Sequence, residues 1–66
     1  MTQHGFMIIK ILKTVNIYLW AQTREELEEN MRDLKLDPRK GYRIVPLFKD
    51  GEKEFLKVDN KYLRIA

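Results

Sequence analysis

The residues of this chain that could perform chemistry are few, and they fit turns better than a catalytic centre. Serine and cysteine are absent, which removes the two commonest nucleophiles and every thiolate ligand. The lone histidine, His4, has no second histidine or cysteine with which to build an ordinary zinc site. Asp50, Asp59 and Lys61 have the composition of a Mg²⁺ site with a lysine beside the attacking water. Both aspartates stand in turn-forming dipeptides, however, so we expect a non-enzymatic protein without metal, cofactor or an evident small-molecule substrate.

A different chemistry, binding, is indicated by aromatic residues interleaved with lysine and arginine. In FLKVDNKYLRIA, residues 55–66, bulky apolar and basic residues alternate. The formal net charge is only +3, but it is unevenly distributed. Residues 23–37 contain three basic and six acidic side chains, whereas residues 38–66 contain eight basic and four acidic ones. We therefore expect a charge dipole, with one acidic element on an otherwise basic protein.

Length and composition predict one small soluble domain. Of the 66 residues, 44% are hydrophobic and 35% are charged. Residues 1–5 lack periodicity and should fray, which leaves a domain over residues 6–66. No apolar run reaches the about 20 residues of a bilayer crossing and no signal-peptide pattern is present, so we expect a cytoplasmic protein without a membrane partner. A core this small supplies only about 3–5 kcal/mol of folding stability. Without cysteine, dimerisation is the remaining means of further stabilisation.

The elements that must position these residues are predicted from periodicity and turn residues. Thr23, followed by Glu26, is typical of a helix start, and Pro38 ends the helix before Asp37. Period-two patterns on either side of the helix predict strands. The predicted strands lie near 6–13 and 17–22, joined by a loop at Thr14–Asn16, and near 42–48, 53–58 and 61–65, joined by the turns Asp50-Gly51 and Asp59-Asn60.

The order ββαβββ predicts the α+β class, with one helix packed on a mostly antiparallel sheet. In element order the chain resembles β-grasp domains or a related roll. The sequence leaves the strand order in the sheet open.

Alternation along the predicted strands sorts the side chains into two faces. One face is aliphatic and should pack against a helix stripe of Leu27, Met31 and Leu34. The other face should hold all seven aromatic residues and remain uncovered. The candidate binding surface on that face comprises Tyr18, Trp20, Tyr42, Phe48, Phe55, Lys57, Tyr62 and Arg64.

Three interpretations of this surface remain open. It is an ordinary half-exposed sheet face, whose aromatic residues favour strands and whose lysine stems cover them. It is a contact surface for a protein partner or a second copy, because monomers seldom expose large apolar patches. Alternatively it binds single-stranded nucleic acid, because bases stack on aromatic rings while Lys and Arg hold the phosphates. We expect a small interaction module that binds a protein partner or itself, with single-stranded nucleic acid as the alternative ligand.

Overall fold

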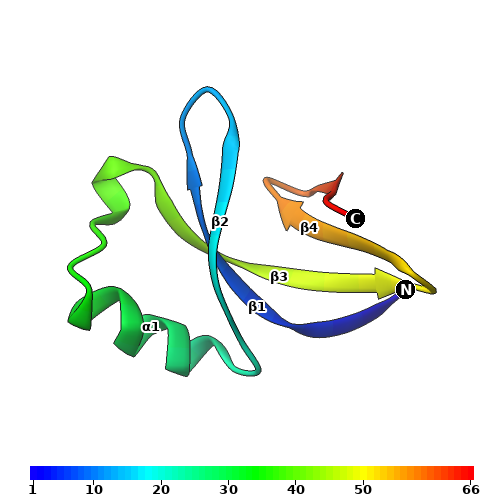
Figure 1. Ribbon diagram of the computed structural model, residues 1–66, viewed down its shortest axis with the longest axis horizontal. Coiled ribbons are helices and arrows are strands. Elements are labelled where there is room, and N and C mark those ends of the chain that lie inside the picture. The colour runs from blue at the N-terminus through cyan, green and yellow to red at the C-terminus, as the bar shows by residue number, and fades with distance from the viewer.

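A computed structural model describes all 66 residues and confirms the α+β class and the ββαβββ order (Figure 1). The strands form one open sheet in the order β2-β1-β3-β4-β5, and every pairing is antiparallel. One α-helix packs on this sheet, and no helix is both long and apolar enough to cross a membrane. The elements are β1 (Thr2–Ile11), β2 (Val15–Ala21), α1 (Arg24–Asp33), the 3-10 turn η1 (Pro38–Lys40), β3 (Tyr42–Asp50), β4 (Lys53–Val58) and β5 (Lys61–Arg64).

The first strand begins four residues earlier than the sequence predicts. Thr2 lies opposite Lys49 and Gln3 lies opposite Phe48, so residues 2–5 belong to the sheet and do not fray. The pairing with β3 is irregular between Gln3 and Phe6, where Gly5 adopts a φ of +85°. This irregularity interrupts the period-two pattern by which a strand is recognised in a sequence.

The last hairpin forms as predicted. Leu56 lies opposite Leu63, and Lys57 lies opposite Tyr62. Asp59 and Asn60 have φ angles of 50° and 65°, the pair of positive values that a two-residue type I′ turn requires. The turn therefore sets the register of β4 against β5.

The hairpin between β3 and β4 turns one residue later than predicted. Asp50 pairs with Lys53, so the turn residues are Gly51 and Glu52, and Leu47 rather than Val45 lies opposite Leu56. The register differs from the predicted one by two positions. Because side chains alternate with period two, each residue keeps its predicted face.

The hairpin between β1 and β2 differs more, because β2 contains a bulge. Its loop is Leu12–Thr14, with Ile11 opposite Val15, instead of the predicted Thr14–Asn16. The register then shifts between Ile8 and Ile9, which pair with Leu19 and Ile17 and leave Tyr18 as the extra residue. The odd shift exchanges the faces beyond the bulge. Ala21 now lies opposite Phe6, and Trp20 opposite Met7.

The helix begins as predicted and ends early. The Thr23 hydroxyl accepts a hydrogen bond from the Glu26 backbone N–H at 3.4 Å, which caps the first turn. The helix ends at Asp33, and Leu34 leaves the apolar stripe with 59% of its surface exposed. Leu36 takes its place, because its backbone N–H bonds to the Met31 carbonyl at 2.9 Å and returns the chain to the sheet.

The prediction that α1 packs on the aliphatic face is wrong. Leu27 is fully buried against Ile8 and Ala21, and Phe6 and Tyr42 pack around them. We call this side of the sheet the helix face. The bulge brings Leu19 and Ala21 to this side, where they complete the apolar bed for Leu27.

The opposite side, which we call the far face, is buried without any helix. Ile9, Val45, Leu47 and Leu56 form its core. The sheet coils strongly, with β2 crossing over β1 and β3 (Figure 1). Partly buried apolar side chains pack around this core, namely Met7, Ile11, Val15, Val58 and Ile65. The aliphatic residues therefore bury one another, and the helix is free to cover the other side.

Candidate functional site

The eight residues of the predicted binding surface do not form one continuous face, contrary to expectation. Trp20 lies on the far face, opposite Met7. Tyr18 and Tyr42 lie together on the helix face, at the end of β3 nearer η1. The remaining five lie on β3, β4 and β5, namely Phe48, Phe55, Lys57, Tyr62 and Arg64. The bulge in β2 separates Trp20 from the others. The helix α1 covers the helix face at β1, β2 and the first residues of β3.

Tyr18 and Tyr42 form an aromatic pair at the edge of the helix-face core. Their ring centroids are 5.6 Å apart with an interplanar angle of 62°, and Lys10 Nζ lies 4.9 Å from the Tyr42 centroid. Tyr42 is half-buried, whereas Tyr18 is 50% exposed. Tyr42 therefore contributes to packing, and Tyr18 is the ring of this pair that can meet another molecule.

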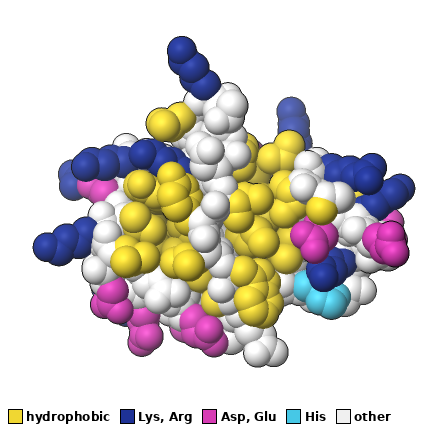
Figure 2. All heavy atoms as spheres, in the orientation of Figure 1, with side chains coloured by type: hydrophobic (Ala, Val, Ile, Leu, Met, Phe, Trp, Pro, Cys, Tyr) yellow, Lys and Arg dark blue, Asp and Glu magenta, His cyan; other side chains and the backbone are white.

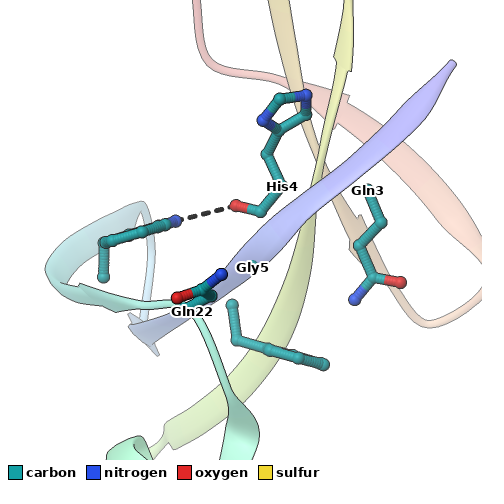
Figure 3. A pocket seen from close by; sticks show the side chains of 6 residues that line it. Gln3, His4, Gly5 and Gln22 are labelled. Atoms are coloured by element: carbon teal, nitrogen blue, oxygen red, sulfur yellow. Dashed lines mark hydrogen bonds between the residues drawn. The ribbon is translucent and has the colours of Figure 1, made fainter.

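Trp20 is one of the residues that line a shallow pocket of about 580 Å³, which Figure 3 shows from close by. Its indole Nε1–H donates a hydrogen bond to the His4 backbone carbonyl at 2.8 Å. Gly5 allows this approach, because a Cβ there would lie against the Ala21 carbonyl oxygen and 2.8 Å from Trp20 Nε1. Sequence reasoning missed this arrangement. Its only signal was a glycine within an otherwise strand-like segment.

The five C-terminal residues form, with Lys53, a cluster that we call the aromatic-basic patch. The ring of Tyr62 lies at its centre, with its centroid 5.5 Å from that of Phe48 and 6.5 Å from that of Phe55, both edge-to-face. Lys57 Nζ lies 5.7 Å from the Tyr62 centroid, and Arg64 is the cross-strand partner of Phe55. The predicted cross-strand pairs of ring and cation are thus confirmed.

Two nearby carboxylates are held away from this patch, whereas Asp50 lies opposite Lys53 on the same side of the sheet. Glu54 lies 3.5 Å from Lys49 Nζ, and Asp59 accepts a hydrogen bond from Arg43 at 2.9 Å. Lys49, Glu54 and Arg43 alternate onto the far face, and Asp59 lies in the turn between β4 and β5. The three cations of the patch, Lys53, Lys57 and Arg64, form no ion pair. The patch therefore combines rings with three cations and one carboxylate, Asp50, and Arg64 Nε also donates a hydrogen bond to the Ala66 carbonyl oxygen at 3.1 Å.

A second candidate surface is the free edge of β2, which the sequence did not reveal because the strand order was open. β2 pairs only with β1, and its seven residues contain no charge and no proline. Ile17, Tyr18 and Trp20 are 45%, 50% and 53% exposed, and Figure 2 shows hydrophobic side chains gathered on both sides of this strand. Edge strands are commonly protected by lysine or proline. The other edge, β5, has four residues, including Lys61 and Arg64.

The one perturbed titrating group belongs to the turn before β3. Asp37 caps η1 by accepting hydrogen bonds from the side chain and the backbone N–H of Arg39. These bonds hold the pKa of the Asp37 carboxyl below its ordinary value of 3.8. This carboxylate shapes a turn, and nowhere in the structure do three potential metal-ligating side chains converge.

No protein-family model matches the chain, and no match was found among curated proteins or solved structures.

Proposed function

We propose that this protein is a non-enzymatic interaction module that associates with a second copy of itself along the edge of β2. The observation that carries the proposal is the composition of that edge, which exposes Ile17, Tyr18 and Trp20 with no charge from Val15 to Ala21. An apolar edge without charge or proline offers unpaired backbone N–H and C=O groups to another strand. Exposed side chains on both sides of the strand would then be covered in the same step.

The large exposed area and the small buried core of the single chain support association. The accessible surface is 4905 Å², whereas a monomer of 8.0 kDa is expected to expose about 4,450 Å². Only seven of the 66 residues are buried, so the core alone gives little stability. Two antiparallel β2 strands related by a two-fold axis present the same apolar surface to each other, which is the geometry of a closed dimer. The second copy therefore offers β2 an edge of matching composition.

Molecular mass in solution tests this proposal. Light scattering or sedimentation at several hundred micromolar should give the mass of a dimer for the wild type. Ile17→Lys places a charge on the edge, which edge-to-edge pairing must desolvate, and should shift the mass toward that of a monomer. Leu34→Lys is the matched control, because Leu34 is equally apolar and 59% exposed but lies beyond the helix. A monomeric wild type, or equal effects of the two substitutions, would overturn the proposal.

A further inference from the structure

We propose that the aromatic-basic patch is a binding site for single-stranded nucleic acid. This function is separate from association along β2, because β2 and β5 form opposite edges of the sheet. The patch lies on the part of the helix face that α1 leaves uncovered, over the ends of β3, β4 and β5.

The rings supply the stacking surface. Tyr62 is 50% exposed, and its edge-to-face contacts with Phe48 and Phe55 hold it without covering that exposed half. A ring fixed in this way loses little conformational freedom when a base stacks on it. Phe48 and Phe55 are half-buried, so they orient Tyr62 and supply apolar surface beside the base.

The cations supply charge complementarity to a phosphate backbone. Lys53, Lys57 and Arg64 alternate with the rings along β4 and β5, and none of them forms an ion pair. The acidic side chains of the helix gather on the other side of β2, as Figure 2 shows at the lower left. Asp50, opposite Lys53, is the one carboxylate on this side of the hairpin, so the cations still outnumber it. A polyanion on the patch therefore meets net attraction without facing the acidic helix.

A single strand fits this arrangement better than a duplex or an acidic peptide. In a duplex the bases are already stacked on one another, so the exposed half of Tyr62 would find no free base face. An acidic peptide would use the cations but would gain nothing specific from the ring. Loss of affinity on removing the ring therefore distinguishes a stacked nucleotide from any other polyanion.

A fluorescence anisotropy titration with a labelled oligothymidylate of about ten nucleotides tests the proposal. Binding is expected at low salt, and three phosphate contacts should make log K fall with log salt with a slope of about −2. Tyr62→Leu, which keeps apolar bulk but removes the flat ring, should weaken binding by about tenfold. Lys57→Gln should reduce the steepness of the salt dependence by about one third.

The matched control is Tyr18→Leu, because Tyr18 is also 50% exposed but lies away from the patch. This variant should bind the oligonucleotide as the wild type does, and circular dichroism should show that both variants are folded. No binding at low salt would overturn the proposal, as would equal losses for Tyr18→Leu and Tyr62→Leu. Competition by polyglutamate as strong as that by oligothymidylate would instead assign the patch to acidic protein surfaces, and would likewise overturn it.

Discussion

Replacing Gly5 by alanine should destabilise the protein more than its small change in volume suggests. At a φ of +85°, the backbone of Gly5 lies outside the region that L-residues ordinarily adopt. The added methyl group would also press on the Ala21 carbonyl oxygen, which belongs to the backbone and cannot rotate away. The same methyl would lie 2.8 Å from Trp20 Nε1, so the indole must move from its hydrogen bond with His4.

The expected loss can be built from these parts. An alanine at positive φ costs about 1–2 kcal/mol. Loss of the hydrogen bond from Trp20 to the His4 carbonyl costs about 0.5–1.5 kcal/mol more. The two parts together give a loss of about 1.5–3.5 kcal/mol, out of a total that is about 3–5 kcal/mol for a core of this size. In a domain of about 60–100 residues this lowers Tm by about 6–28 °C, at about 4–8 °C per kcal/mol.

Thermal and urea denaturation, followed by far-UV circular dichroism and Trp20 fluorescence, would measure this loss. Gly51→Ala is the matched control, because Gly51 also has a positive φ, of +63°, but a Cβ there meets nothing within 4 Å. It should lose only the conformational part, about 1–2 kcal/mol. The folded Gly5→Ala variant should also show altered Trp20 emission. If both variants lose the same stability and the emission is unchanged, the close approach at Gly5 is not what holds Trp20.

Two further predictions concern the helix and the turn that follows it. Leu27→Ala should cost about 2–5 kcal/mol of stability and leave much of the protein unfolded at 25 °C by circular dichroism, because Leu27 is fully buried. The control Leu34→Ala should change stability by less than about 0.5 kcal/mol. A similar loss in both variants would refute the assignment of Leu27, and not Leu34, to the buried side of the helix. For Asp37, an NMR titration should give a pKa below 3.8, and Arg39→Gln should raise it toward that value. Because the folded-state pKa is lowered, the stabilisation by Asp37 is present above pH 3.8 and is lost as the pH falls through the folded-state pKa. A wild-type pKa at or above 3.8 would contradict this prediction.

The features that the sequence predicts correctly are those decided within a few residues. The Asp59-Asn60 turn needs only two residues that tolerate positive φ, and it sets the register of the last hairpin. The start of the helix needs only a hydroxyl at Thr23 and the N–H of Glu26. Even the shifted turn at Gly51 preserves the predicted faces, because it moves the register by two.

The features that the sequence does not predict depend on contacts between distant segments. Nothing near Tyr18 signals that it becomes the extra residue of β2, yet this single residue moves Trp20 to the far face. The choice of sheet face for α1 then follows from where Leu19 and Ala21 lie after the bulge. The five C-terminal members of the predicted surface stay together because they depend only on the local β3–β4–β5 registers.

The two cores described above meet at a single peptide bond. Ile8 and Ile9 are adjacent and both fully buried, but Ile8 belongs to the core under α1 and Ile9 to the core on the far face. β1 is also paired on both sides, with β2 and with β3. Opening this strand exposes both cores at once, so neither can persist as an independently folded half. We therefore expect the amide protons of Ile8 and Ile9 to exchange with solvent only when the whole chain unfolds, as a single cooperative unit.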